Sequence, residues 1–115
     1  MNEQKAVEAE TVDALGPDSR GWWLVTTASG TQHEWDLDRR TYKRIPAPGS
    51  KGMTMPTDNS AFPIWQVGAW PKLGESTYVE LDASYSEVVW WWSTPVTRIE
   101  RMVEARAEGR TEIEL

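Results

Sequence analysis

The chain has 115 residues, a formal net charge of −6, no cysteine and eight tryptophans. This length predicts one domain with one core, and the lack of cysteine excludes disulfides, thiolate metal sites and cysteine nucleophiles. The chain holds no run of 18 apolar residues and does not open like a signal peptide, so we expect a soluble, cytoplasmic protein without a membrane partner. The acidic balance disfavours nucleic acid as a partner, because like charges repel.

Residues 1–20 are polar, rich in Ala and Glu, and closed by Gly16-Pro17. Their apolar residues form no convincing helical stripe. We therefore predict a flexible acidic N-terminal arm over 1–20, a single β domain over 21–109 and a loose tail over 110–115.

A β-hairpin is the clearest local structure in the sequence. Residues 22–27 are aromatic and β-branched, Ala28-Ser29-Gly30 suits a tight turn, and residues 31–37 alternate in polarity. The alternation places His33, Trp35 and Leu37 on one face and Gln32, Glu34 and Asp36 on the other.

Further strands are predicted downstream of the hairpin. Residues 41–45 form a polar strand, and a long loop of functional or mobile type follows over 46–60. Residues 62–70 contain Pro63 and Gly68, so they fit an edge or bulged strand, and residues 77–81 alternate with Val79 and Leu81 inward.

The run Val88-Val89-Trp90-Trp91-Trp92, which precedes Ser93-Thr94-Pro95, is apolar on both strand faces. We interpret it as a central strand whose Trp90 and Trp92 meet the core and whose Trp91 faces the other way. Cover for the second face would come from the C-terminal segment, the long loop or another chain.

The end of the chain allows two interpretations. Residues 96–99 predict a short strand, followed by an amphipathic helix that ends near Gly109; a strand continued to Val103 is the alternative. The fold class is therefore all-β, or β-dominated α+β: a small antiparallel roll or partly open barrel of about six or seven strands.

Two segments resemble a family pattern. The run T-T-A-S-G-T-Q-H-E-W-D-L and the later W-W-W-S-T-P-V-T-R-I-E are similar to the two ends of a group of small β-proteins encoded by actinobacteria and their phages. The resemblance covers about a third of the chain. It implies a β-fold and an actinobacterial or phage source, and it assigns no activity or site residues.

No catalytic or cofactor motif stands out in the sequence. His33 is the only histidine and shares a face with Trp35 and Leu37, so we expect a structural, hydrogen-bonded side chain. Asp36 and Asp38 could pair as acid and base, but turn carboxylates beside arginines are more often solvated. Neither GxxxxGK[ST] nor GxGxxG occurs. We expect no enzyme, no metal site and no cofactor.

The indoles carry the functional hypotheses. Eight tryptophans exceed what one small core needs, and exposed indoles are enriched at binding hot spots. We assign Trp35, Trp90 and Trp92 to the core. The predicted contact patch, for a protein partner or a homo-oligomer, comprises Trp23, Trp65, Trp70 and Trp91.

Alternative ligands stay open at this point. Single-stranded nucleic acid could stack on the indoles, with phosphates on a basic cluster of Arg39, Arg40, Lys43 and Arg44. An acidic decoy of a DNA-binding protein and a carbohydrate-binding protein are further hypotheses.

Overall fold

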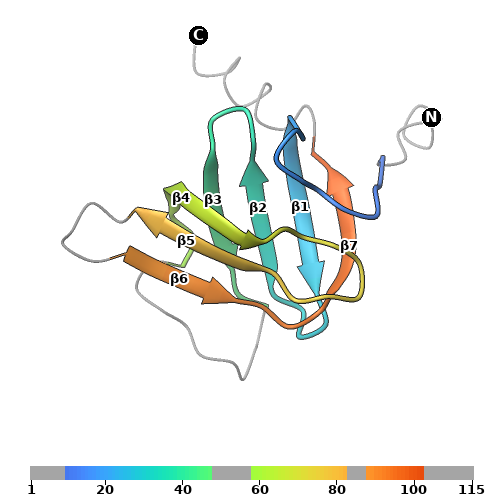
Figure 1. The fold of residues 1–115 in the computed structure, drawn as a ribbon. Helices are drawn as coiled ribbons and strands as arrows, with labels where there is room; N and C mark the ends of the chain where they lie inside the picture. The colour runs from blue at the N-terminus through green and yellow to red at the C-terminus, as the bar shows by residue number, and fades with distance from the viewer. Residues whose placement is uncertain (1–9, 48–57, 83–87, 103–115) are drawn as a thin grey trace, which may run out of the picture.

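The computed structural model describes residues 10–47, 58–82 and 88–102. These residues form one antiparallel sheet of seven strands in the order β6-β5-β4-β3-β2-β1-β7. The strands are β1 (Trp22–Thr27), β2 (Gln32–Asp36), β3 (Thr41–Ile45), β4 (Ala61–Ala69), β5 (Tyr78–Asp82), β6 (Val88–Trp92) and β7 (Val96–Arg101). The predicted all-β class is confirmed, and the sheet rolls up without closing (Figure 1).

Strand β4 divides the sheet into two layers. Its residues 61–63 pair with β3, and its residues 64–69 pair with β5. Register shifts within the second part mark bulges, which bend a strand and increase its twist. Strands β4, β5 and β6 therefore cross over the face of β1, β2, β3 and β7 (Figure 1). The predicted bulge is confirmed, but β4 lies inside the sheet and not at its edge.

The predicted hairpin is formed by β1 and β2. Their register runs from Trp22↔Asp36 to Thr26↔Gln32, and Gly30 adopts φ 91° in the connecting turn. A positive φ is readily accessible to glycine because it has no Cβ. The face that carries His33 and Trp35 is buried, as the alternation predicted.

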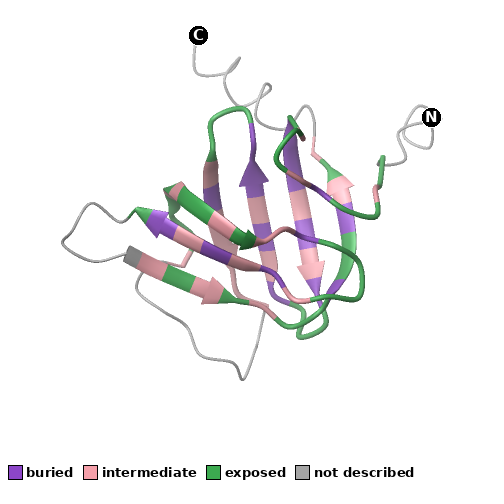
Figure 2. Ribbon diagram, in the orientation of Figure 1, coloured by how far each residue is buried: buried purple, intermediate pink, exposed green. Residues whose placement is uncertain are grey.

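The core lies between the two layers, and Figure 2 shows the buried segments of the strands. Trp35 is fully buried (0% exposed) and packs edge-on against Tyr42, with 5.4 Å between ring centroids, and beside Trp70 at 5.8 Å. The other buried members are Leu15, Trp23, Val25, Leu37, Val79, Leu81, Val96 and Ile99. Large indoles thus fill much of a small core.

Residues 10–20 also belong to the fold. The Val12 N–H donates to the Ile99 carbonyl and the Arg101 N–H donates to the Glu10 carbonyl, so this segment runs along the outer edge of β7. Leu15 enters the core and is 5% exposed. The prediction that order begins at Gly21 is wrong for these residues, because backbone groups pair with an open strand edge whatever the side-chain pattern. Residues 1–9 of the predicted arm lie outside the described residues.

Strand β7 extends the predicted C-terminal strand to Arg101. Its pairing with β1 runs from Thr27↔Val96 to Trp23↔Arg101. A helix beginning at Ile99 is therefore wrong, because these backbone groups are used in the sheet. The rest of the predicted helix and the tail, like the long loop at 48–57, lie outside the described residues. Within the described ranges, no helix has the length and apolarity needed to cross a bilayer.

Candidate functional site

The outer side of β6 carries two exposed indoles. Trp90 is 59% exposed and Trp92 is 65% exposed, whereas Trp91 is partly buried and packs against the core. Successive side chains of a strand point to opposite faces, so Trp90 and Trp92 share the outer face. The prediction that they fill the core is wrong: the alternation was correct, but the two faces were exchanged.

Tyr78 of β5 joins these indoles into one surface. The register places Tyr78 opposite Trp92 and Glu80 opposite Trp90. The ring centroid of Tyr78 lies 5.2 Å from that of Trp92 and 6.1 Å from that of Trp90. Gly68 makes room for this ring, since a Cβ there would come within 2.6 Å of Tyr78 Cδ2.

Polar groups border this surface. The Tyr78 hydroxyl donates to Glu80 Oε2 (2.7 Å), and Gln66 Nε2 donates to Glu80 Oε1 (2.9 Å). The hydrogen bond to the Glu80 carboxylate raises the pKa of Tyr78. The tyrosine therefore stays protonated and its position on the sheet is fixed.

Trp65 of β4 extends the exposed aromatic surface. The register shift between Ile64 and Gln66 leaves Trp65 60% exposed, as predicted. With at most about 250 Å² per indole, the three exposed tryptophans present about 450 Å². Exposed indoles are enriched at binding hot spots. We call the surface formed by Trp65, Tyr78, Trp90 and Trp92 the aromatic face.

The aromatic face borders an open edge of the sheet. β6 ends the strand order, and among the described strands it pairs only with β5, so the predicted central position is wrong. The Ser93 N–H donates to the Thr77 carbonyl (2.9 Å), so Ser93 and Thr77 form a hydrogen-bonded pair. In an antiparallel ladder, hydrogen-bonded and non-hydrogen-bonded pairs alternate along the strand. By this alternation, the backbone groups of Trp90 and Trp92 point away from β5. The opposite edge, at β7, is covered by residues 10–12.

Three other predicted contact residues lie in or near the core. Trp23 is 4% exposed and its Nε1–H donates to the Arg20 carbonyl (2.8 Å), so its predicted exposure is wrong. Trp70 is partly buried against Trp35, and Trp91 lies under the Arg44 guanidinium, 4.9 Å from the ring centroid. The neighbouring indoles Trp22 and Trp23 take opposite faces of β1, since Trp22 lies on the outer side beside Glu34 and Trp23 lies in the core.

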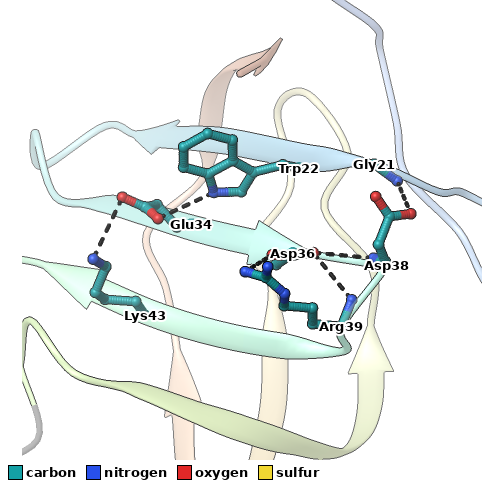
Figure 3. A network of polar contacts seen from close by, with 7 residues as sticks. All are labelled: Gly21, Trp22, Glu34, Asp36, Asp38, Arg39 and Lys43. Carbon is teal, nitrogen blue, oxygen red and sulfur yellow. Dashed lines mark hydrogen bonds and ion pairs between the residues drawn. The ribbon is translucent and has the colours of Figure 1, made fainter. Parts of the chain in front are cut away.

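The predicted basic cluster is not brought together. Lys43 pairs with Glu34 (3.7 Å) and Arg39 pairs with Asp36 (3.7 Å) on the outer side of β2 and β3 (Figure 3). Arg44 points inward and pairs with Asp58 at 2.6 Å. Arg40 occupies the intervening turn with φ 62°. Since none of the four lies on the aromatic face, that face offers no matching phosphate site.

The two aspartates considered as an acid–base pair stabilise local structure. Asp36 Oδ1 accepts from the backbone N–H groups of Asp38 (3.2 Å) and Arg39 (3.0 Å), and Asp38 Oδ1 accepts from Gly21 N–H (3.0 Å) (Figure 3). Both carboxylates thus satisfy turn donors. Within the part of the chain that the structure describes, no group of three potential metal-ligating side chains occurs.

Comparison with protein-family models, with curated proteins and with solved structures finds no match to this chain.

Proposed function

We propose that this chain is a non-enzymatic interaction module, and that its partner is a second copy of itself. In this proposal the two β6 strands pair antiparallel at their open edges. The observation that carries the proposal is an apolar edge strand beside an exposed aromatic face.

The composition of β6 supports this role. Natural edge strands discourage pairing through charges, proline or bulges. Val88–Trp92 contains none of these, and its register with β5 is regular. A strand of this kind is suited to adding a further strand through main-chain hydrogen bonds.

Two identical β6 edges suit each other. An antiparallel pair of the same strand has two-fold symmetry, so each residue contributes equally to both sides. The strand carries no charge, so pairing creates no direct repulsion between copies. The indoles Trp90 and Trp92 of both chains would then line one continuous face. Their exposed surface, with that of Trp65, supplies about half of the roughly 800 Å² that a standard interface buries per partner.

The geometry favours a protein partner over single-stranded nucleic acid. Stacking on Trp65, Trp90 and Trp92 is sterically open, but base stacking normally accompanies a basic groove along the backbone. Arg39, Lys43 and Arg44 are each ion-paired, and the Glu80 carboxylate is hydrogen-bonded to Tyr78 on the aromatic face.

The test is the molar mass in solution at increasing protein concentration, measured by light scattering or sedimentation. We expect the wild-type chain to reach the mass of a dimer and Trp90→Lys to remain monomeric, because the introduced charges meet at the two-fold axis. Thr97→Lys is the matched control, since it adds the same charge at an exposed position of β7. A monomeric wild type at every concentration, or a Trp90→Lys variant that still dimerises, contradicts the proposal.

A further inference from the structure

A pocket of about 220 Å³ opens where the β1–β2 hairpin meets the end of β6. It lies at one end of the roll and shares Trp92 with the aromatic face that the proposed function uses. Its lining combines hydroxyl groups, two indoles, one imidazole and one guanidinium, among them Ser29, Thr31, His33, Arg44, Trp91 and Trp92.

His33 brings a buried, unpartnered ring nitrogen to this pocket. The side chain is 5% exposed, and its Nδ1 is hydrogen-bonded to the Tyr42 hydroxyl. Burial raises the pKa of Tyr42, so the phenol keeps its proton and shares a hydrogen bond with Nδ1. The other ring nitrogen, Nε2, has no hydrogen-bond partner in the described part of the chain. A buried polar nitrogen of this kind is costly unless a partner reaches it.

A chain of hydroxyl groups leads into the same pocket. Thr94 Oγ1 donates to Ser29 Oγ (3.3 Å), and Ser29 Oγ donates to Thr31 Oγ1 (3.2 Å). With this direction of donation, the proton of the Thr31 hydroxyl can be given to a bound molecule. The pocket therefore offers two polar groups to a ligand hydroxyl, the Thr31 hydroxyl and the His33 Nε2.

The charge of the pocket is balanced. The Arg44 guanidinium is ion-paired with Asp58 at 2.6 Å, and their side chains are only 16% and 5% exposed. The guanidinium also lies over the Trp91 ring. An anion would therefore find no unbalanced positive charge, and the whole chain carries −6.

We infer that this pocket binds a neutral polyhydroxylated ring, such as a single sugar unit. Its hydroxyl groups would hydrogen-bond with His33 Nε2 and with the Thr31 hydroxyl, and its apolar C–H face would lie against the Trp92 indole. The volume is below the roughly 300–1,000 Å³ of pockets for drug-sized ligands, which suits one ring. Trp92 belongs to both proposed surfaces, but sugar binding does not require the proposed self-association.

The experiment is a titration of the ¹⁵N-labelled protein with glucose, galactose, mannose and N-acetylglucosamine, followed by amide chemical shifts. We expect at least one sugar to give saturable shifts centred on Thr31, His33 and Ser93. Trp92→Ala should weaken that sugar at least tenfold, whereas Trp65→Ala, equally exposed but outside the pocket, should not. Thr31→Val should weaken it about fivefold and Thr97→Val should leave it unchanged.

Trp90→Lys separates the two proposals, because Trp90 lies outside the pocket lining. It should abolish dimerisation and retain sugar binding. The inference is overturned if none of the four sugars gives saturable shifts, or if the shifts centre on Trp65 and Trp90. Tighter binding of inorganic phosphate than of any sugar also overturns it, since the site would then recognise an anion.

Discussion

His33 shows how a buried side chain can be both structural and available to a ligand. The pKa of His33 is lowered to about 4, chiefly by desolvation on burial and also by the nearby Arg44, with Asp58 acting in the opposite direction. The imidazole is therefore neutral at pH 7. The sequence predicted a structural, hydrogen-bonded histidine, and the bond to Tyr42 confirms it. The orphan Nε2 was not predictable, because it depends on what β3 and β6 bring around the ring.

The pKa of His33 predicts a dependence of stability on pH. Unfolded His33 takes up a proton below about pH 6.5, whereas the folded side chain does so only near pH 4. The stabilisation is therefore complete above pH 6.5 and is lost as the pH falls towards 4, by about 3 kcal/mol in total. His33→Gln should show a shallower decline between pH 6.5 and 5 in urea unfolding. Equal slopes for the two proteins in that interval would contradict this assignment.

The segment at residues 10–15 acts as a structural element although it forms no named strand. It covers the edge of β7 through backbone bonds and places Leu15 in the core, while Leu73 N–H donates back to the Asp13 carbonyl. The sequence suggested a flexible arm because the segment is polar, and one buried leucine gives no periodic signal. Edge pairing of this kind depends on the sheet topology, because it requires β7 to lie at the edge of the sheet.

This arrangement predicts unequal effects from two leucine truncations. Leu15→Ala should lower the free energy of unfolding by about 2–5 kcal/mol, because it leaves a cavity in the core. Leu73 pairs with the same segment through its backbone, but its side chain is 40% exposed. Leu73→Ala should therefore lower the free energy of unfolding by less than about 1 kcal/mol. Both values come from denaturant unfolding. Similar losses for the two variants would show that the segment does not pack as described.

At the scale of the whole molecule, the two ends of the open sheet differ. The β7 edge is covered by the chain's own residues 10–12, whereas the β6 edge carries no described cover. Rolling β4, β5 and β6 over the other layer buries Trp91 and Val89 against the core and turns Trp90 and Trp92 outward. The asymmetry leaves one apolar edge for association.

Association through β6 predicts that thermal stability depends on protein concentration. A dimer that forms only from folded chains is stabilised by mass action. A tenfold rise in concentration should raise the Tm of the wild type by about 2–5 °C. The Tm of Trp90→Lys should stay constant, and that of Thr97→Lys should follow the wild type. A wild-type Tm that does not change with concentration contradicts a dimeric native state.

The strand class, the hairpin at 22–36 and the two-faced alternation around His33 and Trp35 could all be predicted from the sequence. These are local properties, set by residue periodicity and turn chemistry. Three features could be seen only in the folded chain: which face of Val88–Trp92 is inside, the burial of Trp23, and the opposite directions of Arg39 and Arg44. The reason is that periodicity distinguishes the two faces of a strand without saying which one meets the core. That choice follows from the register of β5 with β6 and from the bend in β4.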